Sequence, residues 1–169
     1  MSAFTVRPMR ATDLRAVLPV QAHCYGNALV ESAEALASRL TLSPDTCWVA
    51  ALPDGTLAGY VFTHAWPEAS LPPWNGVLAC DWPADAALTW FVHDMAVAPA
   101  GRGTGVAAQL YGAARDVAKR AGLRTSRLIA VQSADAYWRR LGYAPIDPHA
   151  HARKLATYGD AALLMGCRL

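Results

Sequence analysis

The sequence predicts a single α/β domain over residues 1–169, with a mixed central sheet of about six to seven strands flanked by about four helices. Three observations predict it. A nearly continuous apolar run, "ALTWFVHDMAVA", is followed by a glycine-rich segment and then by an amphipathic helical run. The elements alternate as strand, helices, strands, helix, strand, helix and strand, which is typical of one mixed sheet covered by helices. A chain of this length buries enough apolar surface to fold without disulfides or metal.

The first half of the chain predicts a strand, two helices and a hairpin. Phe4–Pro8 alternates in hydropathy and ends at a proline, as strands do. Thr12 is expected to cap a helix that continues to Gly26, and Leu29–Leu40 has the periodicity of a second helix. The segments "TCWVAAL" and "TLAGYVFTHAW" flank Asp54-Gly55, which indicates a β-hairpin turn.

The middle of the chain combines an irregular segment with a buried strand. Residues 66–87 are rich in proline and tryptophan, so we expect a long surface excursion that lines a site. Residues 87–98 are apolar throughout, which suits a strand buried on both faces. Regular alternation would place Phe91, His93, Met95 and Val97 on one face, and Trp90, Val92, Asp94 and Ala96 on the other.

The last third predicts two helices, each followed by a strand. Val106–Ala121 has an apolar stripe and ends at Gly122, a residue that commonly terminates helices. The segment "TSRLIAVQ" is expected to form a strand, and "SADAYWRRLGY" a short helix capped by Ser133 and stopped at Gly142. The final segment "DAALLMGCRL" is expected to form a terminal strand.

Composition and charge exclude several classes of partner. The formal net charge is +2, with Lys and Arg spread along the chain, so we expect no nucleic-acid surface. No run of about 20 apolar residues predicts a membrane span, and the first residues lack a secretory signal. The four cysteines lack metal-type spacing, and His149 and His151 lack further ligands, so we expect no metal. Reduced thiols without a signal indicate a cytoplasmic protein.

The segment "GRGTGVA" places Gly101, Gly103 and Gly105 between the buried strand and the following helix. It lacks the Lys-Ser/Thr of a P-loop and the third glycine of a dinucleotide fingerprint. Two interpretations remain open. One is a tight turn without a ligand. The other is an anion cradle, in which the free amides at a helix start and the side chain of Arg102 bind a phosphate.

Residues Val92–Tyr143 resemble the Gcn5-related N-acetyltransferases (GNAT). The family signature Arg/Gln-x-x-Gly-x-Gly/Ala is matched by Arg102, Gly105 and Ala107. The preceding "HDMAVAP" is similar to the family's fourth strand, and "AYWRRLGY" is similar to its aromatic Leu-Gly segment. The resemblance implies a GNAT fold with splayed fourth and fifth strands, acetyl-coenzyme A as co-substrate, and direct transfer of an acetyl group to an amine.

The resemblance also implies which residues hold the coenzyme. The pyrophosphate would lie on the amides of residues 102–107, and the pantetheine arm would run along the fourth strand. Ser133 would replace an asparagine that relatives often carry before the last helix. The implied coenzyme contacts are Met95, Ala96, Val97, Arg102, Gly103, Thr104, Gly105, Val106, Ala107, Ser133 and Trp138.

Proton transfer is assigned to three residues near the expected thioester. His93 and Asp94 are candidates for the base that deprotonates the amine, His93 for its intrinsic pKa and Asp94 as a carboxylate that orients water or attracts a cation. The position where relatives place a tyrosine acid is Trp138, and an indole cannot serve as an acid. Tyr137 is therefore the candidate acid.

The acceptor pocket is expected to come from the first two helices and the excursion. Its candidate residues are Tyr25, Glu31, His64, Trp66 and Trp74. The alternative role for Glu31 is a solvated acid in the first turn of a helix, and tryptophans more often pack than bind a ligand. Glu31 would hold an ammonium group. The predicted acceptor is a small-molecule or peptide amine, and a homodimer is a candidate assembly. The alternative function is an acyl-coenzyme A-binding module without turnover.

Overall fold

The computed structural model describes residues 3–169 and contains one seven-stranded sheet in the order β1-β2-β3-β4-β5-β7-β6. The strands are β1 Thr5–Pro8, β2 Trp48–Ala51, β3 Leu57–Pro67, β4 Leu88–Val97, β5 Thr125–Ala130, β6 Ala144–Pro145 and β7 Leu163–Arg168. The helices are α1 Leu14–Tyr25, α2 Ala33–Leu42, α3 Val106–Arg120, α4 Asp135–Arg140 and α5 Ala152–Ala156. The β4–β5 pair is parallel and the other strand pairs are antiparallel, so the predicted mixed sheet is confirmed.

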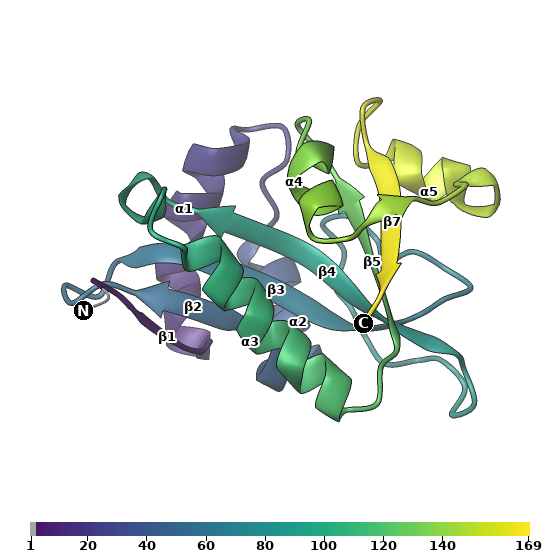
Figure 1. Cartoon of the computed structure of the whole chain (residues 1–169), viewed down its shortest axis with the longest axis horizontal. Helices are drawn as coiled ribbons and strands as arrows, with labels where there is room; N and C mark the ends of the chain where they lie inside the picture. The colour runs from purple at the N-terminus through teal and green to yellow at the C-terminus, as the bar shows by residue number, and fades with distance from the viewer. Residues whose placement is uncertain (1–2) are drawn as a thin grey trace.

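Helices cover both faces of the sheet (Figure 1). The long helix α3 packs on one face, where Leu110 and Tyr111 meet Trp90 of β4. Helices α1 and α2 pack on the other face, where Val17 and Leu36 meet β3. The apolar faces of these helices and the alternating strand residues therefore enclose two core layers, one on each side of the sheet.

Three helix starts differ from those the sequence predicts. Thr12 lies inside a short 3₁₀ turn, Ala11–Asp13, and does not cap α1. Helix α2 begins at Ala33 because the Ser32 hydroxyl accepts a hydrogen bond from the Ala35 amide at 3.1 Å. Ser133 has a positive φ of 62° and makes no capping bond, and α4 follows Ala134. The later start of α2 leaves residues 29–31 in a loop, where Glu31 can turn toward the sheet.

The excursion between β3 and β4 is docked onto the rest of the protein by hydrogen bonds. The side chain of Asn75 accepts from the Ser32 amide at 2.7 Å, and the Leu78 amide donates to the Ser38 hydroxyl at 2.9 Å. These two bonds fasten the excursion along α2. The excursion is therefore held against α2 by hydrogen bonds to its start and its middle.

Strand β4 contains a bulge at His93. Asp94 pairs with Phe62 and Val92 pairs with Thr63, so His93 is the extra residue. A bulge shifts the alternation of a strand by one residue. The predicted faces of β4 are therefore wrong beyond the bulge: Met95 and Val97 pack with Trp90 and Val92 on the α3 side, whereas Asp94 and Ala96 share the α1–α2 side with Phe91 and His93.

The parallel strands β4 and β5 separate partway along their length. They pair only from Trp90–Ser126 to Val92–Leu128, although β4 continues to Val97 and β5 to Ala130. The expected splay of the fourth and fifth strands is confirmed. Within residues 3–169, no helix combines the length and the apolar character needed to cross a membrane.

Candidate active site

A cleft of about 280 Å³ opens where β4 and β5 diverge. One wall is β4 from Val92 to Val97, and the opposite wall is the end of β5 with Tyr137 and Trp138 of α4. The third side comes from segments distant in the sequence: Tyr25, Leu29, Glu31, Trp74 and Tyr158. The excursion therefore contributes Trp74 to the cleft, as expected from its composition.

The free edge of β4 presents backbone groups to the cleft. The Ala98 amide donates to Ala58 of β3, and successive residues of a strand direct their amides and carbonyls to opposite edges. The backbone amides and carbonyls of Met95 and Val97 therefore face the cleft, while those of Ala96 face its partner Tyr60 on β3. At this edge the Tyr25 hydroxyl donates to the Met95 carbonyl at 2.9 Å, and the Cys24 thiol to the Val97 carbonyl at 3.4 Å.

The glycine-rich loop follows β4 directly and leads into α3. Gly103 and Gly105 have positive φ angles of 73° and 81°, and a Cβ on either would meet no atom within 4 Å. Gly105 precedes the first residue of α3, so the amides of Val106 and Ala107 lack helical partners. Arg102 and Thr104 are exposed in the same loop. The loop thus offers open space, free amides and a cation.

Gly101 has a different role from the other two glycines. It is buried, and a Cβ at this position would collide with the carbonyl oxygen of Ala58 and touch Val97. Its small size is therefore required by close packing of the loop against β3. Neither a ligand cradle nor an ordinary turn requires glycine at this position, whereas the close approach to the Ala58 carbonyl does.

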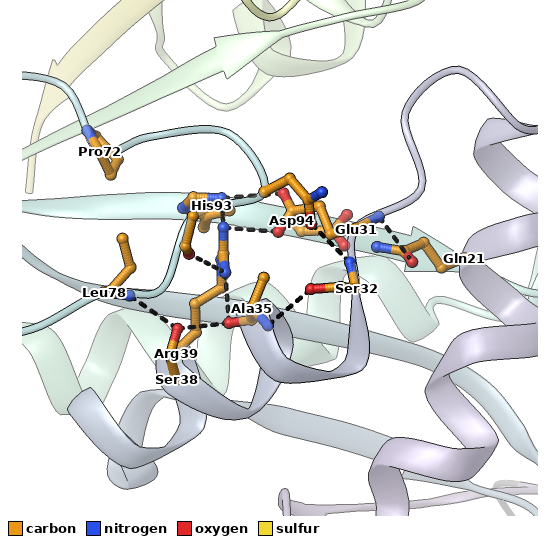
Figure 2. A network of polar contacts seen from close by, with 12 residues as sticks. Gln21, Glu31, Ser32, Ala35, Ser38, Arg39, Pro72, Leu78, His93 and Asp94 are labelled. Atoms are coloured by element: carbon orange, nitrogen blue, oxygen red, sulfur yellow. Dashed lines mark hydrogen bonds and ion pairs between the residues drawn. The ribbon is translucent and has the colours of Figure 1, made fainter.

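A buried polar network lies beneath the cleft (Figure 2). Arg39 of α2 has no exposed side-chain surface, and its Nη2 lies 2.6 Å from Oε2 of Glu31 and 2.8 Å from Nε2 of His93. Its Nη1 donates to the carbonyls of Ala35 and Gly76. The Gly76 carbonyl belongs to the excursion, so this segment encloses the guanidinium.

The hydrogen bonds determine the tautomers of two histidines. Nδ1 of His64 lies 3.1 Å from the Ala65 carbonyl and must donate, which leaves its Nε2 to accept from Nδ1 of His93 at 3.1 Å. Nε2 of His93 then accepts from Arg39, and it also lies 3.2 Å from Oε1 of Glu31. Burial lowers the pKa of both imidazoles well below the usual value, and Arg39 lowers that of His93 further. Both rings are therefore neutral at pH 7.

Two carboxyl groups border the cleft with raised pKa values. Burial raises the pKa of Glu31 to about 7, against the opposing effect of Arg39. Burial likewise raises the pKa of Asp94 to about 6. The Tyr60 hydroxyl donates to Oδ2 of Asp94 at 2.7 Å and orients it. Groups that titrate near neutrality suit proton transfer.

The structure brings most of the predicted site residues together. Tyr25, Glu31, Asp94, Tyr137 and Trp138 all line the cleft, and burial raises the pKa of Tyr137. The side chain of His93 has no exposed surface, so His93 borders the cleft through its backbone.

The predicted coenzyme contacts 102–107 form the glycine-rich loop outside the cleft lining, and three further predicted residues lie away from both the loop and the cleft. His64 is fully buried behind His93, and Trp66 packs against Trp82. Ser133 lines a separate depression, and its neighbour Gln132 borders the cleft instead. His64 and Trp66 do not reach the cleft because they belong to β3, which lies one strand further from it than β4.

Sequence reasoning missed Arg39, Gln132 and Tyr158. The signal for Arg39 was its spacing: it lies three residues after Leu36 and one before Leu40, on the buried face of α2. The hydroxyl of Tyr158 donates to the Pro72 carbonyl of the excursion at 2.9 Å, a contact between segments that no local pattern reveals. Among residues 3–169, no cluster of three His, Cys, Asp or Glu side chains could hold a metal.

Comparisons with known proteins identify the fold. No curated protein sequence matches this chain. The structure of Ard1 from Thermoplasma volcanium has a TM-score of 0.71 at 14% identity, covering 99% of this chain and 98% of that one. Naa50 of Arabidopsis thaliana, solved with the bisubstrate analogue CoA-Ac-MVNAL, has a TM-score of 0.70 at 10% identity, covering 99% of each chain. GphF, a GNAT-like decarboxylase solved with isobutyryl-CoA, has a TM-score of 0.69 at 19% identity, covering 97% of this chain and 98% of that one.

A sequence profile adds the family. The profile of the acetyltransferase (GNAT) family matches residues 14–143, which include the cleft strands, the glycine-rich loop and α4. The profile covers more than half of the chain, and the splayed strands and the open helix start are found within it. The chain therefore belongs to the acetyltransferase (GNAT) family.

Proposed function

We propose that this protein transfers an acetyl group from acetyl-coenzyme A directly to an amine. The observation that carries the proposal is the free edge of β4, which connects two groups suited to this reaction. The open start of α3 follows the C-terminal end of this edge, and the carboxyl groups of Glu31 and Asp94 lie near its beginning at the bulge. The similar structures solved with coenzyme A compounds support the choice of donor.

The donor end fits a phosphate-bearing group. Free amides at a helix start bind anions, and the open space around Gly103 and Gly105 admits a pyrophosphate close to the backbone. Arg102 adds a cation, and the hydroxyl of Thr104 already donates to Gly101 at 2.6 Å. The cleft-facing amides of Met95 and Val97 suit an amide-bearing arm laid alongside, while their carbonyls already accept from Tyr25 and Cys24. When bound, the coenzyme supplies the acetyl group as a thioester.

The acceptor end supplies a proton acceptor. An ammonium group must lose a proton before it can attack a carbonyl, and a base with a pKa near the working pH is most effective. We assign this role to Glu31, whose pKa is about 7. Asp94, oriented by Tyr60, attracts the ammonium group into the cleft. His93 positions the network because its Nε2 lone pair is already occupied by Arg39.

Tyr137 is proposed to protonate the departing sulfur. It lines the β5 side of the cleft, opposite the two carboxyl groups, and its hydroxyl is a donor. Trp138 beside it is 8% exposed and packs against Tyr111 and Tyr143, so it supports the wall.

The test is release of coenzyme A thiol from acetyl-coenzyme A with a panel of small amines and short peptides, with mass spectrometry of each acetylated product. We expect thiol and N-acetyl product in equal amounts for at least one amine. Trp138 favours a second candidate, a binding module without turnover, because an indole stands where relatives carry the acid. Tight coenzyme binding by calorimetry with no thiol released by any amine would replace the first proposal with the second.

A further inference from the structure

The side chains that line the cleft carry acids but no permanent cation. Glu31 and Asp94 are the carboxyl groups, and among the described residues that border the cleft there is no lysine and no arginine. The histidine at this wall, His93, is neutral and enclosed. A ligand group that enters the acceptor end therefore meets two carboxyl groups and no available positive charge.

The nearest cation is unavailable to a ligand. Arg39 has 0% side-chain exposure, and its Nη2 is shared by Glu31 and His93. Nη1 is bound by two backbone carbonyls, one of them from the excursion. Arg140 is exposed on α4 with its guanidinium 5.6 Å from the ring centre of Tyr137, and it does not line the cleft.

The remaining wall of the acceptor end is apolar and aromatic. Leu29 comes from the α1–α2 loop, Trp74 from the excursion and Tyr158 from the turn after α5. The Tyr158 hydroxyl is occupied by the Pro72 carbonyl, so the ring presents its carbon surface. These three side chains suit an apolar group attached to the reacting amine.

We propose that the acceptor is an amine whose neighbouring carbon carries an apolar group and no carboxylate, so that free α-amino acids are excluded. This inference rests on the proposed acetyl transfer. A carboxylate next to the amine would be placed within a cleft that already holds two acids, without a cation to pair it. Burying an unpaired charge costs several kcal/mol. Arylalkylamines and peptide N-termini share the permitted chemistry.

The test compares kcat/KM for phenylalanine, phenethylamine and phenylalaninamide. Phenethylamine has a more basic amine than phenylalanine, and phenylalaninamide has a less basic one. A preference for both over phenylalanine therefore reports the carboxylate and not amine basicity. We expect each to exceed phenylalanine by at least about 100-fold, since every 1.4 kcal/mol is tenfold. Equal values for phenylalanine and phenethylamine would overturn the inference.

A binding measurement separates this inference from the proposed reaction. Calorimetry with the coenzyme A-loaded protein gives the affinity for phenethylamine and for phenylalanine without turnover. Weaker binding of phenylalanine supports the inference even where no thiol is released, and equal binding contradicts it. A tetrapeptide with N-terminal phenylalanine then distinguishes a peptide acceptor from a small amine. A kcat/KM above that of phenethylamine indicates a peptide acceptor, and a kcat/KM below it indicates a small amine.

A charge-addition variant tests the cause of the discrimination. Leu29→Arg places a guanidinium at the partly exposed rim of the cleft, and Leu29→Gln is its neutral control. We expect Leu29→Arg to reduce the phenethylamine-to-phenylalanine ratio at least tenfold, while Leu29→Gln leaves it within about twofold. The same reduction in both variants would show that apolar contact, and not the missing cation, sets the preference, and would overturn the charge argument.

Discussion

Arg39 donates from Nη2 to Nε2 of His93 at 2.8 Å, and this contact decides what the histidine can do. An arginine side chain has no acceptor, so the imidazole nitrogen must supply its lone pair. The other ring nitrogen is occupied by His64 at 3.1 Å. Although His93 has the intrinsic pKa of a general base, it is buried and fully bonded. A carboxylate keeps further lone pairs when it is bonded, so Glu31, although paired with Arg39, and Asp94 remain able to accept a proton.

Replacing Arg39 should destabilise the fold. Arg39→Met removes one partner of a buried ion pair and leaves the carboxylate of Glu31 unpaired, which typically costs about 3 kcal/mol. We expect urea denaturation to show a lower free energy of unfolding by this amount. The double variant Arg39→Met/Glu31→Gln should recover at least about 1 kcal/mol, because it leaves no buried charge. Strictly additive losses would mean that the two side chains do not stabilise each other.

The pH dependence of turnover should identify the base. With the pKa of Glu31 at about 7, kcat at saturating amine should rise with pH and level off above about pH 7, because the ionised carboxylate is the active form. Glu31→Gln should lower kcat by about 100-fold and abolish this rise. His93→Gln keeps an acceptor for Arg39 and should retain the inflection. Loss of the inflection in His93→Gln alone would transfer the role to the histidine.

Gly105 should matter for coenzyme binding and Gly122 should not. Both glycines adopt positive φ, 81° and 91°, at opposite ends of α3, and a Cβ on either meets no atom within 4 Å. Alanine at each position should therefore destabilise the fold by a similar amount, about 1 kcal/mol. Only Gly105→Ala adds a methyl group beside the free amides of α3. We expect calorimetry to show at least tenfold weaker binding of coenzyme A for Gly105→Ala and unchanged binding for Gly122→Ala. Equal affinities of the two variants would contradict the role of the glycine-rich loop in binding the pyrophosphate.

Asp94 should make the fold less stable as pH rises. Its folded pKa is about 6 against a usual 3.8, so the folded protein keeps a proton that the unfolded chain has already released. The free energy of unfolding therefore falls between about pH 4 and pH 6, by about 3 kcal/mol, and the loss persists above pH 6. Asp94→Asn should reduce this fall in denaturation curves from pH 4.5 to 7.5. The part that remains comes from Glu31, whose folded pKa of about 7 lowers stability in the same direction. Asp81→Asn, at an exposed position of the excursion, is the control; an identical slope for wild type and Asp94→Asn would refute the prediction.

Much of the fold could be predicted because its elements carry local patterns. The apolar run of β4 and the stripe of α3 come from neighbouring residues, and the two boundaries of α3 agree with the structure within one residue. The sequence predicts the start of α2 too early because Leu29 and Val30 continue the apolar pattern, whereas the helix begins only where Ser32 can bind a free amide. The excursion was recognised by composition, but its attachment to α2 was not.

The sequence by itself determined the order of the main elements, although not β6 and α5, together with the open glycine turn before α3 and the family to which those segments belong. Only the tertiary structure decided which side chains meet at the cleft. The bulge at His93 turns Asp94 to the same side as His93, and a bulge depends on pairing with β3 and not on β4 alone. Arg39 reaches that network from α2, 54 positions away from His93. Contacts between distant segments depend on how elements pack, and local patterns of hydropathy do not encode them.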